Sequence, residues 1–318
     1  MKYRVLVSAP YAMPVIERYE RDLAAADCEV IVADVRERLS EEQLLKVVGD
    51  VDGIICGDDQ ITVRVLDAAP RLKAISKWGT GIDSIDAAAA RARGIPVMNT
   101  PNAFSEPLAD TVLGYILIAA RRLPKMDADI RAGQWVKPQL VSLREKTLGI
   151  IGLGNCGKAV ARRASAFGMR ILACDVLPMP EEFLTRHNVR MAPLEELLKE
   201  SDFVTLHADL NSETRHLINA RTLGLMRASS FLVNTSRGPV VDEKALVEAL
   251  RAKKIAGAAM DVFEVEPLPA DSPLRALDNC WLAPHNSNSS PEAAERVHSN
   301  TIGNLVRALK QSKEKLGA

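Results

Sequence analysis

Polar side chains able to move protons or bind anions follow several apolar runs in the second half of the sequence, each just after the run ends. They are Asp175, His207, Thr235 to Arg237, Asp261 and His285, with Glu266 in the loop five residues past Asp261. Ligands of open α/β sheets bind outside the carboxyl ends of the strands, so these side chains could line one crevice. An acid–base histidine, a carboxylate that orients it and an arginine that holds an anion form the minimum set for hydride transfer to a 2-oxo acid, without a metal.

A glycine-rich motif that could bind a dinucleotide lies about halfway along the chain. A short apolar strand at 148–151 precedes three glycines, Gly152, Gly154 and Gly157. At this spacing, glycines supply a tight turn, close approach of the backbone to a pyrophosphate and close packing of the following helix on the sheet. The pyrophosphate can then sit at the N-terminus of that helix.

The residues that follow complete a strand, helix and strand. Ala164 and Phe167 recur on one apolar face of the predicted helix, and Gly168 is placed to end it. The next apolar run, 171–174, ends in Asp175, whose carboxylate can accept hydrogen bonds from an adenosine ribose and would repel a 2′-phosphate. The sequence therefore predicts a dinucleotide-binding unit that prefers NAD to NADP.

Composition narrows the class of protein. With 318 residues, 47% of them hydrophobic, the chain is long enough for two domains with cores of their own. Forty-one basic residues balance forty-one acidic ones, so no overall basic field favours nucleic acid or an anionic membrane as a partner. The start of the sequence does not resemble a signal peptide, and no apolar run is long enough to span a membrane. We expect small-molecule chemistry in the cytoplasm.

The cysteines and three of the histidines show no spacing typical of a metal site. The cysteines form no CxxC pair and are expected to be reduced and buried; they are Cys28, Cys56, Cys156, Cys174 and Cys280. His187, His216 and His298 have no cysteine or carboxylate partners at ligand spacing, so we expect them to be structural or solvated.

Alternation of apolar runs with helical patterns predicts an α/β fold in both halves of the chain. The first half has apolar runs at 5–7, 30–33, 53–56, 74–76 and 96–98, separated by helical patterns near 14–26, 41–48 and 62–69. In the second half the runs continue at 203–206, 231–233, 258–260 and 281–283. We therefore expect two Rossmann-like or flavodoxin-like domains with doubly wound parallel sheets.

The domain limits follow from the position of a last helical pattern, which begins at Ser290-Pro291 and runs towards Leu309. We expect this helix to return to the first domain and make it discontinuous. The predicted substrate domain then comprises residues 1–101 and 291–318, and the NAD-binding domain residues 102–290.

The motifs resemble those of the D-isomer-specific 2-hydroxyacid dehydrogenase family over essentially the whole chain. In the family's order they are Gly79-Thr-Gly-Ile-Asp83, Asn99-Thr-Pro-Asn102, Gly152-Leu-Gly-Asn-Cys-Gly157, Asn234-Thr-Ser-Arg-Gly238, Met260-Asp-Val-Phe-Glu-Val-Glu-Pro267 and Ala283-Pro-His285. The resemblance implies that Arg237 binds the substrate carboxylate and polarises the carbonyl, and that His285, paired with Glu266, donates or accepts the proton. A carboxylate partner favours the charged imidazole, which would raise the pKa of His285 and let it protonate an alkoxide near neutral pH.

The resemblance also implies binding residues for substrate and cofactor. A loop of Lys77, Trp78, Gly79, Thr80 and Gly81 would bring backbone amides and the Lys77 charge to the substrate carboxylate, although the same glycines suit a plain tight turn. The implied cofactor contacts are Thr111, Gly152, Gly154, Asn155, Cys156, Gly157, Asp175, His207, Thr235, Arg237, Asp261 and His285. For His207 the match is incomplete, because Asp209 stands where a proline is usual, and a lone histidine can simply cap a strand.

The substrate is less well defined than the family. The first two motifs most resemble those of phosphoglycerate dehydrogenases, yet no room is left for an appended regulatory domain, so glyoxylate or hydroxypyruvate reduction is the alternative. Phosphite oxidation also stays open. Asn286-Ser-Asn-Ser-Ser290 replaces the Gly/Ala-rich segment that the family usually places beside the nicotinamide, which leaves the pocket shape open.

Two alternative functions, from other classes of protein, would use the same glycine-rich loop. Relatives of this fold serve as NAD-sensing transcriptional co-repressors, and a methyltransferase could bind S-adenosylmethionine at a similar strand end. The complete set of Arg237, Glu266 and His285 argues for an oxidoreductase instead. From the family we also expect a homodimer formed through the cofactor domain, with a contribution from a helix over Glu106 to Arg122 that Ser105 would cap and that would cross between the domains.

Overall fold

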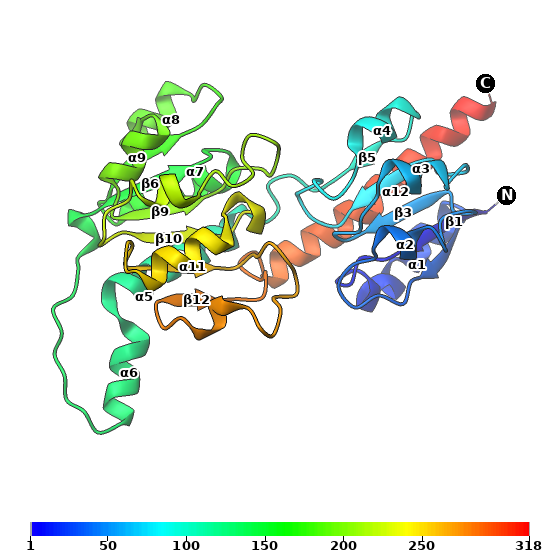
Figure 1. Cartoon of the computed structure of the whole chain (residues 1–318). Coiled ribbons are helices and arrows are strands. Elements are labelled where there is room, and N and C mark those ends of the chain that lie inside the picture. Colours follow the sequence, from blue (N-terminus) through cyan, green and yellow to red (C-terminus); the bar gives the residue numbers. More distant parts are fainter. Residues whose placement is uncertain (1, 318) are drawn as a thin grey trace. The chain divides into compact units, whose positions relative to one another are not determined.

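The computed structural model describes residues 2–317, with side chains up to residue 312. Contacts within the chain divide it into two compact units (Figure 1). Unit 1 contains the residues up to 103 together with those from 290 onwards, and unit 2 contains residues 104–289. These limits lie within two residues of the domain limits expected from the sequence.

Unit 1 is built on a five-stranded sheet in which neighbouring strands are parallel. The strands are β1 (Tyr3–Val7), β2 (Cys28–Val32), β3 (Gly53–Cys56), β4 (Ala74–Lys77) and β5 (Val97–Met98), in the spatial order β2-β1-β3-β4-β5. β3 and β4 are buried along their whole length, as expected for central strands of a parallel sheet covered on both faces. This order is the flavodoxin-like arrangement, so the predicted fold of the first domain is confirmed.

The helices of unit 1 include one from the far end of the sequence. They are η1 (Met13–Tyr19), α1 (Glu20–Ala25), α2 (Glu41–Leu44), α3 (Val63–Asp67), α4 (Ala87–Ala92) and α12 (Pro291–Gly317). α12 packs against β3, β4 and β5 (Figure 1), and its Leu305 and Leu309 share a buried cluster with Val5 and Val7 of β1. Gly53 permits this close packing, since a Cβ there would lie 3.1 Å from Cδ1 of Leu305. Unit 1 is therefore built from two separate stretches of the chain.

Unit 2 is built on a seven-stranded parallel sheet. Its strands are β6 (Thr147–Ile151), β7 (Arg170–Cys174), β8 (Val189–Met191), β9 (Phe203–Leu206), β10 (Phe231–Asn234), β11 (Gly257–Met260) and β12 (Cys280–Leu282), in the order β12-β11-β10-β9-β6-β7-β8. The strand order reverses at β6, which pairs with β7 on one side and β9 on the other. This is the doubly wound Rossmann arrangement, whose ligands bind at the switch point beyond the carboxyl ends of the strands.

Helices cover both faces of the unit 2 sheet. They are α5 (Ser105–Arg121), α6 (Leu123–Arg131), η2 (Leu143–Glu145), α7 (Asn155–Ala166), α8 (Glu181–Arg186), α9 (Leu194–Glu200), α10 (Ala220–Leu223), η3 (Gly238–Val240), α11 (Glu243–Arg251) and η4 (Pro273–Ala276). Ile116 of α5 and Val160 of α7 pack with Ile150 in one buried cluster. Leu246 of α11 packs with Leu206 in the other. Two buried layers therefore hold the strand ends in place.

Several expectations about local structure are wrong. Ser105 is the first residue of α5 and not its cap, because Phe104 holds the N-cap position. α5 lies within unit 2, packed on α7, and does not cross between the units. Phe167 follows the last residue of α7 and is 44% exposed, so it does not share the buried face of Ala164. β8 was not expected from the sequence, since Arg190 interrupts its short apolar run.

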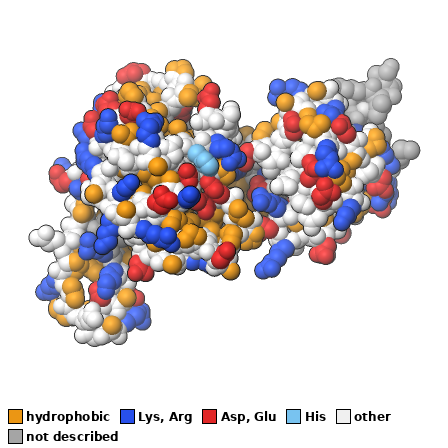
Figure 2. Space-filling model, in the orientation of Figure 1, with side chains coloured by type: hydrophobic (Ala, Val, Ile, Leu, Met, Phe, Trp, Pro, Cys, Tyr) orange, Lys and Arg blue, Asp and Glu red, His pale blue; other side chains and the backbone are white. Residues whose placement is uncertain are grey.

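The cysteines are unpaired, and only some of them are fully buried. Cys28, Cys56 and Cys280 are buried, whereas Cys156 and Cys174 are partly exposed. The expectation of buried thiols therefore holds for three of the five. Within residues 2–317 no helix is both long and apolar enough to cross a membrane. Acidic and basic side chains are interspersed on the visible face of each unit (Figure 2), in keeping with the balanced composition.

Candidate active site

The glycine loop between β6 and α7 can adopt its conformation only with glycine at two positions. Gly152 has a φ of +90°, and a Cβ there would lie 2.7 Å from the backbone N of Ala208. A Cβ on Gly157 would lie 2.1 Å from the carbonyl oxygen of Gly152. At Gly154, the N-cap of α7, a Cβ would meet nothing within 4 Å among the described residues. The loop is therefore tightly packed at Gly152 and Gly157 and open at Gly154, at the helix N-terminus, where a pyrophosphate would fit.

Asp175 holds this loop against the end of β7. Its Oδ2 accepts the backbone N–H of Leu153 at 2.6 Å, and its Oδ1 accepts that of Leu177 at 2.8 Å. Each carboxylate oxygen has two lone pairs, so both can still accept a hydrogen bond from a ribose hydroxyl. The structural role of Asp175 was not expected from the sequence.

Two buried polar atoms at the strand ends lack partners among the described residues: Oγ1 of Thr235 and Nδ1 of His207. Thr235 follows β10 and His207 follows β9, so both stand at the carboxyl edge of the sheet. Buried polar groups are nearly always hydrogen-bonded, and an unpaired one calls for a ligand or water. Together with the open space at Gly154, these atoms fit a bound dinucleotide.

Burial also keeps His207 uncharged. It lowers the pKa of His207 to about 3, and Nε2 of the ring lies 3.0 Å from Oγ1 of Thr205. The imidazole is therefore neutral at physiological pH. Cys156, also expected at the cofactor site, lies with Asn155 at the start of α7. Its Sγ is 3.7 Å from Oγ of Ser105, and burial raises its pKa.

The turn after β10 presents Arg237. Buried Asn234 accepts hydrogen bonds from the backbone N–H and the hydroxyl of Ser236 at 3.1 and 2.9 Å, and its Nδ2 donates to the carbonyl of Arg237 at 3.0 Å. Nη1 of Arg237 donates to the carbonyl of Ser236 at 2.9 Å. A Cβ on Gly238 would lie 1.9 Å from the carbonyl carbon of Phe263, so this turn lies directly against the chain that leads to Glu266.

Glu266 and His285 form the pair predicted from the sequence. Oε2 of Glu266 lies 2.9 Å from Nδ1 of His285, and Oε1 accepts the backbone N–H of Phe263 at 2.9 Å. The two side chains are 24% and 28% exposed, so solvent or a ligand can reach them. With Nδ1 beside the carboxylate, the imidazole is placed as an acid–base group that can carry a proton on either ring nitrogen.

The backbone of His285 is held in an unusual conformation. Its φ is +52°, and its N–H donates to the carbonyl of Asp261 at 2.7 Å. Non-glycine residues with positive φ are uncommon and cluster at functional sites.

Asp261 and Thr111, both expected to contact the cofactor, also hold the segment that follows His285. The fully buried carboxylate of Asp261 accepts the backbone N–H groups of Asn286 and Ser287, each at 2.9 Å. Oγ1 of Thr111 donates to the carbonyl of Ser287 at 2.9 Å. The segment that departs from the family pattern is therefore anchored on both α5 and the end of β11.

The predicted substrate loop, Lys77 to Gly81, lies in unit 1, whereas the other predicted site residues lie in unit 2. Nζ of Lys77 pairs with Oδ1 of Asp58 at 3.0 Å and donates to the carbonyl of Trp78 at 3.1 Å, and the Lys77 side chain is 5% exposed. Gly79 has a φ of +125°, and its carbonyl accepts the N–H of Thr100 at 2.8 Å.

The remaining histidines have local partners. Nε2 of His216 lies 2.8 Å from Oε1 of Glu264, and Nδ1 of His298 bonds to Trp78. Within residues 2–317 no three His, Cys, Asp or Glu side chains are grouped so as to hold a metal ion.

Comparison with known proteins shows which family and which enzymes the chain resembles. Residues 113–287 match the family model described as "D-isomer specific 2-hydroxyacid dehydrogenase, NAD binding domain". The chain is 42% identical over 291 residues to a glyoxylate reductase of Thermofilum pendens, covering 89% of this chain and 86% of that protein. It is 39% identical to a D-3-phosphoglycerate dehydrogenase of Methanocaldococcus jannaschii, covering 89% of this chain but 54% of that protein.

Among solved structures, the chain resembles a D-lactate dehydrogenase of Aquifex aeolicus complexed with NAD and lactic acid. The TM-score is 0.87 at 28% identity, and the match covers 99% of this chain and 97% of that one. Both the sequence and the fold therefore match NAD-binding oxidoreductases over nearly the whole chain.

Proposed function

Because the chain belongs to the D-isomer-specific 2-hydroxyacid dehydrogenase family, and is thus an NAD-dependent oxidoreductase acting on CH–OH groups, we propose that it reduces small, unphosphorylated 2-oxo acids. Glyoxylate and hydroxypyruvate are the proposed substrates. The observation that carries the chemistry is the 2.9 Å contact between Glu266 and His285, which places a carboxylate beside an acid–base imidazole.

The proposed roles of the residues follow from their geometry. The glycine loop and the end of β7 would hold NADH, which when bound would supply the hydride for reduction of the substrate carbonyl. Nε2 of protonated His285 donates a proton to the carbonyl oxygen, and the negative charge of Glu266 stabilises the imidazolium until transfer. Arg237 binds the substrate carboxylate with its planar guanidinium fork. In the oxidative direction neutral His285 accepts the hydroxyl proton.

The cofactor site is proposed to prefer NAD over NADP. The carboxylate of Asp175 stands at the end of β7, already bonded to Leu153 and Leu177. An adenosine 2′-phosphate at this place would meet a negative charge, whereas a ribose hydroxyl could donate to it. Gly152, Gly154, Gly157 and Thr235 are the other residues we assign to cofactor binding.

The burial of Lys77 and its ion pair with Asp58 support an unphosphorylated substrate. A phosphate subsite in the predicted substrate loop would need the Lys77 ammonium, which is buried and paired with Asp58. Such an ion pair partly neutralises the charge available to a phosphate. We still assign the loop Lys77 to Gly81 to substrate binding, through its backbone amides. Reduction of 3-phosphohydroxypyruvate, which the sequence motifs favour, is the second candidate.

The experiment that tests these proposals follows NADH oxidation with glyoxylate, hydroxypyruvate, 3-phosphohydroxypyruvate and pyruvate, then repeats the series with NADPH. We expect the highest kcat/KM with an unphosphorylated acid and NADH. A higher kcat/KM with the phosphorylated acid, lost in Lys77→Gln, would establish the second candidate. If NADH binds but no acid reacts, the protein is an NAD-sensing binding protein of the co-repressor type.

We further propose that the enzyme is a cytoplasmic homodimer that assembles through unit 2, as is usual in the family. The exposed Leu123, Ile130 and Trp135 in and after α6 support a contact there, because large apolar side chains cluster at protein interfaces. Light scattering that gives a monomer at assay concentrations would exclude the dimer.

A further inference from the structure

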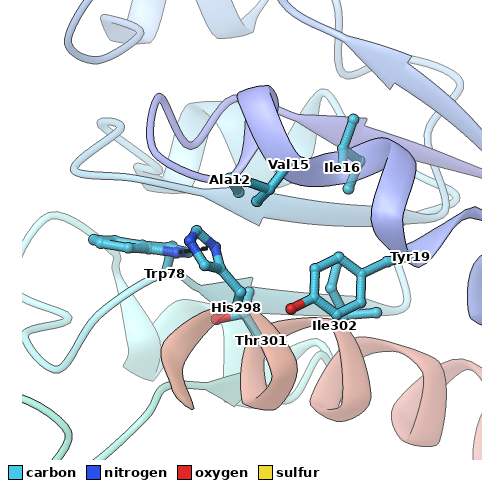
Figure 3. Close-up of a pocket in the computed structure, with 8 residues that line it drawn as sticks. All are labelled: Ala12, Val15, Ile16, Tyr19, Trp78, His298, Thr301 and Ile302. Carbon is cyan, nitrogen blue, oxygen red and sulfur yellow. Dashed lines mark hydrogen bonds between the residues drawn. The ribbon is translucent and has the colours of Figure 1, made fainter. Parts of the chain in front are cut away.

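His298, on α12, fixes the indole ring of Trp78 in unit 1. Nε1 of Trp78 donates a hydrogen bond of 3.0 Å to Nδ1 of His298 (Figure 3). On its other side the indole stacks on Tyr11, with ring centroids 5.0 Å apart and an interplanar angle of 27°. His298 is itself buried. The side chain next to Gly79 is therefore tied to the long helix.

The surroundings of this pair are largely apolar. Figure 3 shows Val15 and Ile16 of η1, and Ala12 just before it, on one side of the two rings, and Ile302 of α12 lines the same pocket. In such surroundings a partly buried indole N–H that loses its acceptor is only incompletely compensated by water. The Trp78 position should therefore depend on His298.

The backbone of the loop has other anchors. The N–H of Trp78 donates to the carbonyl of Cys56 at 2.8 Å, and the hydroxyl of Thr80 donates to the carbonyl of Thr100 at 3.1 Å. The first bond ties the loop to the end of β3, and the bonds of Gly79 and Thr80 to Thr100 tie it to the segment that follows β5. His298 supplies the anchor on the side of α12, and it is an acceptor that protonation abolishes.

We propose that His298 is a positioning residue for substrate binding. When neutral, it accepts the Trp78 indole N–H and holds the loop Lys77 to Gly81 in its binding conformation, and when protonated it releases Trp78. This inference rests on the proposed function, because it takes that loop to bind the substrate.

The charged groups around His298 decide when it titrates. Glu295 lies one turn earlier on α12 and is bonded to Nη2 of Arg18 at 2.7 Å and to the hydroxyl of Tyr19 at 3.3 Å. Burial lowers the pKa of His298, Arg18 lowers it further, and Glu295 acts in the opposite direction. The imidazole is therefore neutral at pH 7 and becomes charged only in more acidic solution.

The test measures KM for the best 2-oxo acid between pH 5 and 8 in three proteins. His298→Leu removes the acceptor, whereas His298→Asn keeps an oxygen near the place of Nδ1 but cannot titrate. A single hydrogen bond corresponds to a change of about two- to tenfold. We expect His298→Leu to raise KM by about this factor at every pH, and wild-type KM to rise similarly towards pH 5. His298→Asn should keep a wild-type KM at pH 7.5 and show no rise, while kcat and the Kd of NADH stay unchanged in all three.

KM is measured in the reductive direction because this direction needs protonated His285. Lowering the pH keeps His285 protonated, so the proton donor is retained. A second readout uses Trp135→Phe/Trp281→Phe, in which Trp78 is the sole tryptophan. Release of the indole from His298 changes its surroundings and therefore its fluorescence, so the emission should titrate with the same midpoint as KM and lose this titration in His298→Asn.

A wild-type KM that does not change with pH, or one that changes equally in His298→Asn, would overturn the positioning role while leaving the proposed function intact. If no 2-oxo acid is reduced at all, the proposed function fails and this role fails with it.

Discussion

Oε2 of Glu266 lies 2.9 Å from Nδ1 of His285, and the other oxygen of this carboxylate is fixed by the backbone N–H of Phe263. The carboxylate therefore cannot turn without losing a hydrogen bond, and it fixes the orientation of the His285 ring. Glu266 thus orients the proton donor and also favours its protonated, positively charged form. The predictions that follow test this arrangement and the loop that binds the cofactor.

Replacing His285 should remove turnover and leave the fold intact. We expect His285→Ala to lower kcat by about 10²- to 10⁴-fold, the range for loss of a general acid, with NADH binding retained. Because φ of this residue is +52°, His285→Asn is the matched control, since asparagine tolerates this region better than alanine. Stopped-flow hydride transfer, NADH titration and thermal unfolding measure the three properties. Near-normal kcat in both variants would exclude His285 as the proton donor.

Glu266→Gln should shift the pH dependence of catalysis. The amide keeps the shape and can still bond to His285 and Phe263, but it removes the negative charge that favours the imidazolium. Reduction requires the imidazolium, so its activity should fall off at lower pH than in the wild type. The profile of kcat/KM against pH measures this shift. An unchanged profile would mean that Glu266 only orients the ring.

Two glycines of the cofactor loop should differ in how an added methyl group affects the stability of the fold. Gly157→Ala places a Cβ 2.1 Å from the Gly152 oxygen, so it should lower the unfolding temperature and abolish NADH binding. Gly154→Ala adds a Cβ in open space at the N-cap, where alanine is less favourable than glycine by about 0.5–1 kcal/mol. It should still weaken NADH binding, because the methyl group occupies the place proposed for the pyrophosphate. Unchanged NADH affinity in Gly154→Ala would place the pyrophosphate elsewhere.

His207 should make unit 2 less stable in acid. Its pKa is about 3 in the folded protein and 6.5 as the ordinary value, so between these pH values the unfolded chain binds a proton that the folded one excludes. The full contribution to stability is present above pH 6.5 and is lost as the pH falls, by up to about 1.4 kcal/mol per pH unit.

His207→Gln, which cannot titrate, provides the comparison. Denaturant unfolding without cofactor at pH 7.5, 6 and 5 should give a shallower pH dependence in this variant than in the wild type. Parallel pH dependences would mean that His207 takes up protons in the folded state as readily as in the unfolded one.

Much of the fold was predictable because it is encoded in short, local patterns. The three glycines and Asp175 fall within one βαβ unit, and runs such as 203–206 are buried central strands. β8 was missed because a charged residue stands in the middle of a three-residue edge strand. Phe167 was misplaced because its helix ends before it, so the helical period no longer applied.

The Glu266 and His285 pair was predicted from the resemblance, but the supports of the site were not. Asp261 and Thr111 bond to backbone groups of Asn286 and Ser287, which lie in an irregular segment far away in the sequence. A hydrogen bond from a side chain to a backbone group does not depend on the type of the partner residue, so the sequence does not reveal it. The same applies to Lys77, whose ion pair with Asp58 depends on how two loops of unit 1 pack. Asn234 could have been recognised, because an asparagine directly after a strand often caps the following turn.

The return of α12 to unit 1 has a consequence for biosynthesis. Its Leu305 and Leu309 complete the buried cluster around Val5 and Val7, yet the ribosome makes them only after all of unit 2 has been synthesised. Until then one face of the first sheet is exposed on the nascent chain, while residues 104–289 already contain everything needed for their own core. The domain that is translated first is therefore the last to finish folding, because its buried cluster needs residues from the end of the chain.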